Sequence, residues 1–126
     1  MTLRVNRPLV SVVDDDESVR ESLPDLVTEL GYSVRAFSSA EEFLASDCVA
    51  ETRCLILDIA MPGMTGPELQ QELTVRGHAI PVIYITAQAD EIVRSCSLRH
   101  GVVACLFKPF SDTALFEALN AAVRVS

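Results

Sequence analysis

The chain has 126 residues, of which 49% are hydrophobic and 22% are charged, and its formal net charge at pH 7 is −8. This length and composition predict a single domain, residues 1–126, that buries one continuous core. No apolar run approaches the roughly 18 residues needed to cross a bilayer, and residues 1–10 lack a signal-peptide pattern, so we expect a cytoplasmic protein. The excess of 18 acidic over 10 basic residues disfavours direct nucleic-acid binding by this domain.

The four cysteines, Cys48, Cys54, Cys96 and Cys105, show no Cys-x-x-Cys spacing. Cys54 and Cys105 lie inside apolar runs, where a reduced thiol behaves as a small hydrophobic side chain. The pattern favours buried free thiols over metal ligands or disulfides, and it is typical of a reducing compartment.

Short apolar runs rich in β-branched residues alternate with longer segments of helical period. The predicted strands cover residues 9–13, 33–37, 53–57, 81–85 and 103–107. The runs 53–57 and 81–85 are almost continuously apolar, which is typical of strands that are covered on both faces.

Five helices are predicted between and after these strands. The first begins between Asp16 and Ser18 and ends at Gly31, where a left-handed cap is easily formed. The second carries a capping-box pattern, with Ser38 followed by Glu41.

The remaining helices are marked by their ends. The third opens with Pro67 and stops by Gly77. The fourth follows Asp90 as its N-cap and ends at Gly101, and the last follows Ser111 or Asp112 and runs towards Val123. Strict βα alternation with short loops predicts parallel strands, right-handed crossovers and helices on both sheet faces, a doubly wound α/β sandwich. Ligands of such sheets bind at the carboxyl ends of the strands.

Acidic residues crowd this predicted site edge. Asp14 and Asp15 follow the first strand directly, and Asp58 follows the third. Two unit charges about 4 Å apart repel by about 4 kcal/mol at an effective dielectric near 20, so a compensating divalent cation such as Mg²⁺ is expected. An acidic helix start is the alternative, and it is favoured for Asp16 and Glu17.

Asp58 is the candidate phosphoryl acceptor, because a carboxylate at the end of a buried strand can form an acyl phosphate. The alternative is an ordinary strand-end Asp that caps the following loop. Lys108, the single lysine, stands between apolar residues, where its ammonium can pair with Asp58 or with a phosphate oxygen. Thr86 ends the fourth strand and offers a hydroxyl donor, and the Lys108-Pro109 bond is a candidate cis peptide.

These motifs together resemble the receiver domains of bacterial two-component response regulators, over about residues 9–123. The matching segments are VSVVDDDESVR, LILDIAMPGMTGPEL, VIYITA and LFKPF, and in detail they look closest to FixJ-type receivers. The resemblance implies a flavodoxin-like five-stranded sheet of order 2-1-3-4-5 with five helices. It also implies that a partner sensor histidine kinase phosphorylates Asp58, and that the domain catalyses only its own phosphorylation and dephosphorylation.

The resemblance also assigns the cation ligands. Mg²⁺, or another divalent cation such as Mn²⁺, would be held by Asp15, Asp58 and the backbone carbonyl of Ala60, with Asp14 assisting through water. FixJ-type receivers usually precede a DNA-binding output domain. By analogy, the surface of the fourth helix, fifth strand and fifth helix would contact an output domain or partner, or a second copy on phosphorylation.

One departure from the family concerns the conformational switch. The family places an aromatic residue three positions before the lysine, where this chain has Cys105. A thiol lacks the bulk of a ring, so either Phe107, on the same strand face, takes over part of that role or the switch is muted. The sequence favours an altered or muted switch.

Three rival functions fit the sequence less well than a receiver does. A haloacid-dehalogenase-like phosphatase would place a second Asp two residues after its nucleophile, where this chain has Ala60. A flavodoxin-like electron carrier needs a phosphate-cradling loop after the first strand, where Asp14 to Glu17 would repel the flavin phosphate. A degenerate receiver that only binds partners stays open because of Cys105.

Overall fold

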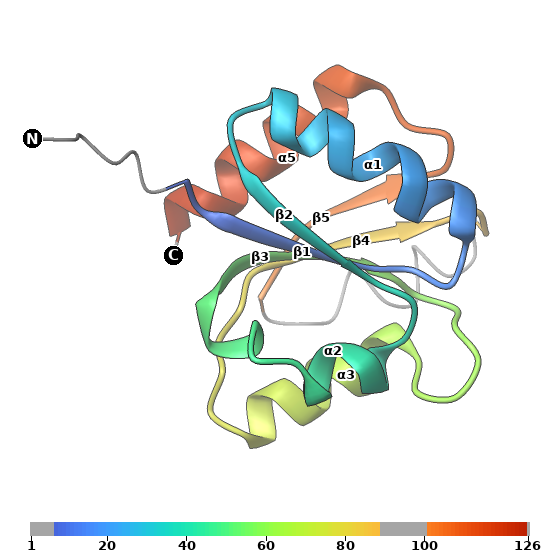
Figure 1. Cartoon of the computed structure of the whole chain (residues 1–126), viewed down its shortest axis with the longest axis vertical. Coiled ribbons are helices and arrows are strands. Elements are labelled where there is room, and N and C mark those ends of the chain that lie inside the picture. The colour runs from blue at the N-terminus through green and yellow to red at the C-terminus, as the bar shows by residue number, and fades with distance from the viewer. Residues whose placement is uncertain (1–6, 89–100, 126) are drawn as a thin grey trace, which may run out of the picture.

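The strands form one parallel sheet with the order β2-β1-β3-β4-β5. This computed structural model describes residues 7–88 and 101–125 (Figure 1). The strands are β1 (Leu9–Val13), β2 (Ser33–Phe37), β3 (Thr52–Asp58), β4 (Val82–Thr86) and β5 (Val102–Phe107). All five predicted strands and their order are confirmed, with ends that differ from the prediction by one residue at most.

Helices cover both faces of the sheet. They are α1 (Glu17–Glu29), α2 (Ala40–Ala45), α3 (Gly66–Val75) and α5 (Asp112–Val125), with a short 3₁₀ helix at Val49–Glu51. Figure 1 shows α1 and α5 together on one side of the sheet and α2 and α3 on the other. Four of the five predicted helices are therefore observed, and the predicted helix at 90–101 falls outside the described residues.

The sheet separates two apolar clusters, and β3 contributes to both of them. Leu55 and Leu57 point into the cluster beneath α2 and α3, whereas Cys54 and Ile56 point into the cluster beneath α1 and α5. All four side chains are fully buried, and the burial of each leucine or isoleucine side chain contributes about 1.5–3 kcal/mol. The strand that carries Asp58 is thus rigidly held on both faces.

The start of α2 differs from the prediction by one residue. The N-cap is Ser39, whose hydroxyl accepts a hydrogen bond from the Glu42 N–H, and the Glu42 carboxylate accepts one from the Ser38 N–H at 2.6 Å. The segment SSAEE contains two overlapping Ser-x-x-Glu patterns, and local sequence cannot choose between them. In the observed register Phe43 is completely buried and both Glu41 and Glu42 are exposed.

The cysteine prediction is confirmed at two positions and wrong at a third. Cys48 and Cys54 are buried free thiols, and burial raises the pKa of Cys54 to about 12, which keeps it protonated and unreactive. Cys105 is disulfide-bonded. Apolar neighbours alone did not reveal this, and Cys96 lies outside the described residues.

Within residues 7–88 and 101–125, none of the helices combines the length and the apolar character that a bilayer crossing requires.

Candidate functional site

The turn between β1 and α1 holds two acids side by side. Asp14 follows β1 and is fully buried, with its Oδ1 accepting a hydrogen bond from the Asp16 N–H at 2.9 Å. Asp16 is the N-cap of α1, and hydrogen bonds from Ser18 lower the pKa of its exposed carboxyl group. Asp16 and Glu17 therefore serve the helix start, as predicted, and Asp14 and Asp15 remain for the site.

Asp58 is the last residue of β3 and is only 6% exposed. The chain then turns sharply so that α3 begins against the backbone of Asp58. A Cβ atom at Gly66 would lie 2.5 Å from the Asp58 carbonyl oxygen, so only glycine allows this close approach. Thr65 and Glu68 form a capping box that fixes the start of α3 at this point.

The sheet edge brings three carboxylates together as the sequence predicted. Asp14, Asp15 and Asp58 each offer an oxygen atom, and these atoms all lie within 4.8 Å of one another. Burial, followed by the negative charge of Asp14, raises the pKa of Asp58 to about 8. An all-oxygen donor set with excess negative charge fits a hard divalent cation such as Mg²⁺.

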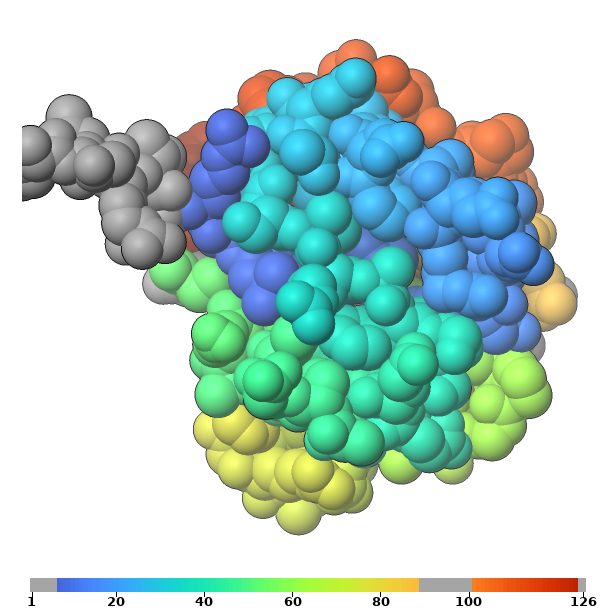
Figure 2. Space-filling view, in the orientation of Figure 1, coloured from blue at the N-terminus to red at the C-terminus, as the bar shows by residue number. Residues whose placement is uncertain are grey.

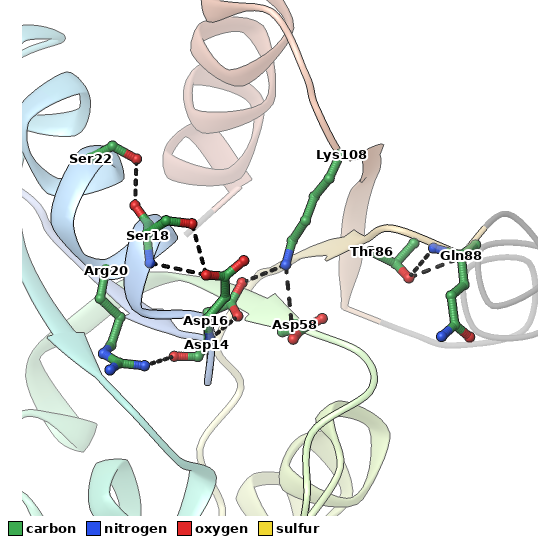
Figure 3. Close-up of polar contacts among 9 residues, drawn as sticks. All are labelled: Asp14, Asp16, Ser18, Arg20, Ser22, Asp58, Thr86, Gln88 and Lys108. Atoms are coloured by element: carbon green, nitrogen blue, oxygen red, sulfur yellow. Dashed lines mark hydrogen bonds and ion pairs between the residues drawn. The ribbon is translucent and has the colours of Figure 1, made fainter.

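Lys108 reaches this group from the end of β5. Its Nζ lies 2.9 Å from Asp14 Oδ2 and 4.0 Å from Asp58 Oδ2. Burial lowers the pKa of Lys108, but the hydrogen bond to Asp14 and the charges of Asp58 and Asp14 outweigh it, and the net shift is upward. The ammonium thus bridges two carboxylates, and its shorter contact is with Asp14 rather than with Asp58 (Figure 3).

The backbone around Lys108 is also defined. Its N–H donates to the Thr86 carbonyl at 2.7 Å, which fixes the end of β5 beside β4. The Lys108-Pro109 peptide bond is cis, which confirms the sequence-based expectation.

Thr86 is buried at the end of β4, but its hydroxyl is engaged away from the acids. Thr86 Oγ1 accepts a hydrogen bond from the Gln88 N–H at 3.0 Å, and it lies 3.4 Å from the Gln88 carbonyl oxygen. Figure 3 shows this pair on one side of the site and the Asp14–Lys108–Asp58 contacts on the other. The structure therefore brings Thr86 to the correct sheet edge with its hydroxyl bonded to the following loop.

The register of β4 and β5 shows which residues lie opposite each other at the predicted switch. Phe107 is the partner of Thr86 across the β4–β5 pair and is 46% exposed, whereas Cys105 pairs with the fully buried Tyr84. Tyr84 donates a hydrogen bond from its hydroxyl to Gln70 of α3 at 2.6 Å. The aromatic residue opposite Thr86 in the strand register is therefore Phe107.

Ala60, the fourth predicted cation ligand, lies two residues beyond Asp58 in an exposed bend. Sequence reasoning missed a contact made by the loop that contains it. Glu41 of α2 accepts a hydrogen bond from the Met64 N–H at 3.1 Å. The only sequence signal for this contact was the overlapping Ser-x-x-Glu pattern, which left one of the two glutamates without a capping role.

Comparison with known proteins agrees with this geometry. Residues 10–120 match the model of the response regulator receiver domain. Nodulation protein W of Bradyrhizobium diazoefficiens is 40% identical over 116 residues, which cover 92% of this chain and 51% of that protein. Among solved structures, FixJ-N is 37% identical with a TM-score of 0.79, and the match covers 92% of this chain and 93% of that one. The response regulator TrrA from Thermotoga maritima, in complex with Mg²⁺-BeF, is 28% identical with a TM-score of 0.78, covering 90% and 97%.

The fold, the site and these matches define one class, and the chain belongs to the receiver domain family of two-component response regulators. Within that family it is a receiver of the FixJ type. The chain spans about half the length of the curated relatives that it matches.

Proposed function

We propose that Asp58 of this cytoplasmic receiver domain, residues 1–126, accepts a phosphoryl group from a partner sensor histidine kinase. The observation that carries the proposal is the meeting of three carboxylates and one ammonium, from Asp14, Asp15, Asp58 and Lys108, at the carboxyl edge of the sheet. Such a site supplies a nucleophile, a cation-binding group and a positive charge for a transferred phosphoryl group.

The residues present fit a Mg²⁺ ion, with Mn²⁺ as an alternative. Asp15, Asp58 and the Ala60 carbonyl would hold the cation, and Asp14 would assist through water. The cation supplies charge neutralisation for the incoming phosphoryl oxygens. For this, Asp58 must lose the proton that burial and Asp14 favour at neutral pH.

Transfer itself needs in-line geometry more than acid or base catalysis. An oxygen of Asp58 forms the new bond to phosphorus while the bond from phosphorus to the donor nitrogen breaks. The Lys108 ammonium, which pairs with Asp14 in the unphosphorylated protein, would then pair with an anionic phosphoryl oxygen. Thr86 is the candidate hydroxyl donor, and it must leave Gln88 to reach that oxygen.

A groove beside Lys108 supports docking of the kinase. It lies between α1 and the β5–α5 connection, and Asp16 and Lys108 are among the residues that line it. The groove combines an apolar lining with acids, namely Val19, Leu23, Leu26, Pro109 and Phe110 with Asp16, Asp25, Glu29 and Asp112. This surface fits a partner helix whose apolar face is flanked by basic residues.

The response to phosphorylation would be altered relative to the family pattern, because Cys105 occupies the aromatic position and Phe107 stands opposite Thr86. The signal would reach an output domain, a partner or a second copy through the surface that includes β5 and α5. Structures with and without a phosphoryl mimic test this part. A full inward Thr86 shift with an undiminished rearrangement of that surface would contradict an altered switch.

Phosphorylation is tested by incubating the protein with acetyl phosphate and Mg²⁺ and measuring the intact mass. We expect a gain of one phosphoryl group that is absent from Asp58→Asn and absent when the cation is chelated. No gain in the wild-type protein would refute the proposal. A gain that persists in Asp58→Asn would move the acceptor to another residue.

A further inference from the structure

The loop between β3 and α3, residues 59–65, begins directly after Asp58 and contains Ala60 as its second residue. Backbone hydrogen bonds fix both ends of this loop. The Ile59 N–H donates to the Ile85 carbonyl at 3.2 Å, and the Gly66 N–H donates to the Ile59 carbonyl at 3.0 Å. The side chain of Met61 is buried in the core cluster beneath α2 and α3.

The tip of this loop is held from α2. Glu41 Oε2 accepts a hydrogen bond from the Met64 N–H at 3.1 Å, across 23 positions of sequence. The preceding residue, Gly63, has a φ of +74°, and a Cβ atom there would lie 2.9 Å from Glu41 Oε2. Glycine at this position therefore permits both the turn and the close approach of the carboxylate.

Helix α2 does not need Glu41 for its own start. The Ser39 hydroxyl accepts a hydrogen bond from the Glu42 N–H, and the Glu42 carboxylate accepts hydrogen bonds from the Ser38 N–H and hydroxyl. Glu41 and Glu42 are adjacent, exposed and equally charged, yet one bonds the loop and the other bonds the helix start. Substituting each glutamate separately therefore distinguishes an effect on the loop from an effect on the start of α2.

We infer that Glu41 is a positioning residue of the phosphorylation site, which holds loop 59–65 so that the Ala60 carbonyl faces the cation. The inference rests on the proposed function, because it needs Ala60 as a cation ligand. Mg²⁺ demands near-ideal octahedral geometry, so a backbone carbonyl on an unsupported loop is a poor ligand. Substituting a residue that orients a metal ligand lowers the metal affinity, which can be measured. A hydrogen bond to a carboxylate is also stronger than a hydrogen bond between neutral groups.

The test measures the Mg²⁺ dissociation constant of the unphosphorylated protein by calorimetry and its phosphorylation rate by acetyl phosphate. For Glu41→Ala we expect Mg²⁺ affinity to fall about fivefold, the typical effect of one exposed hydrogen bond. The phosphorylation rate at saturating Mg²⁺ should stay near that of the wild type. Glu41→Gln keeps an acceptor oxygen and should restore part of the affinity, because a neutral amide oxygen accepts a weaker hydrogen bond than a carboxylate does.

Glu42→Ala is the matched control. It removes the same charge from the same helix turn and weakens the start of α2, which thermal unfolding would report, and we expect wild-type Mg²⁺ affinity. Wild-type affinity in Glu41→Ala would overturn the inference. So would an equal loss in both alanine variants, or a Glu41→Gln variant as weak as Glu41→Ala. Failure of the proposed function looks different, because then the wild-type protein neither binds Mg²⁺ nor gains a phosphoryl group.

Discussion

Two polar regions are buried against the same sheet, and they are built in opposite ways. Near the amino end of β3, the Thr52 hydroxyl donates to the Cys48 carbonyl at 2.7 Å and pairs with the Ser11 hydroxyl at 2.7 Å. This chain of hydroxyl groups, called the hydroxyl pair below, is neutral and satisfied within the fold. At the carboxyl edge, three carboxylates lie together, and one ammonium pairs with two of them.

The two regions contribute differently to the stability of the fold. A satisfied neutral pair avoids the desolvation cost of a buried polar group, so it supports folding. The acidic site carries excess negative charge and raises the pKa of Asp58, so it costs stability until a cation binds. Substitutions in the acidic site should therefore change cation binding, whereas substitutions in the hydroxyl pair should lower stability and leave cation binding unchanged.

The largest expected effect comes from removing one charge of the acidic site. Asp14→Asn should weaken Mg²⁺ binding by about 10- to 100-fold, because the outer support of the cation is lost. Calorimetric titration with Mg²⁺ measures the dissociation constant, and circular dichroism checks the fold. Unchanged Mg²⁺ affinity would show that Asp14 does not support the cation, and it would weaken the contrast between the two regions.

The second prediction concerns pH. Because the cation needs an ionised Asp58 whose metal-free pKa is raised to about 8, Mg²⁺ affinity should rise as pH increases towards that value. The expected slope is about tenfold per pH unit below 8, measured from pH 6 to pH 9. Asp58→Asn is the control, since it cannot bind or release this proton. A pH-independent affinity in the wild type would contradict the buried, protonated carboxyl group.

The same shift carries a stability effect with a defined sign. The folded-state pKa of Asp58 lies above its ordinary value of 3.8, so the metal-free folded protein holds this proton more tightly than the unfolded chain. Its free energy of unfolding should therefore fall as pH rises from about 4 to about 8. Urea unfolding without metal measures this loss, which Asp58→Asn should lack.

The smallest effect on the site is expected from the hydroxyl pair. Thr52→Val leaves the Ser11 hydroxyl and the Cys48 carbonyl without their present partner, and it should lower the free energy of unfolding by about 1–3 kcal/mol. Mg²⁺ affinity should not change, because the substituted residue begins β3 and Asp58 ends it. The double variant Ser11→Ala with Thr52→Val should recover part of the stability. A loss of Mg²⁺ affinity in Thr52→Val would show that the two regions are coupled.

Much of the fold could be predicted because its signals are local and periodic. Apolar runs marked all five strands, and the Pro67 and Gly77 positions marked α3. The acids could be placed together from sequence as well, since the carboxyl ends of neighbouring parallel strands meet at one edge. Asp16 and Asp58 took their expected positions for these reasons.

Other features depend on contacts between distant segments, and no local pattern encodes them. The two Ser-x-x-Glu registers at 38–42 are equivalent locally, and the folded chain adopts the one that begins at Ser39. That choice placed Glu41 against Met64. The disulfide at Cys105 is likewise a property of three-dimensional proximity rather than of the apolar run around it.

The sequence by itself determined which chemical groups stand at the site, because strand ends fix their positions along the chain. Only the tertiary structure decided how those groups are paired. Lys108 lies closer to Asp14 than to Asp58, and the Thr86 hydroxyl bonds to Gln88 rather than to the acids. Alternative partners from different strands differ in distance by a few tenths of an ångström to several ångströms. Electrostatic energies change steeply over that range, so the tertiary structure decides which groups pair.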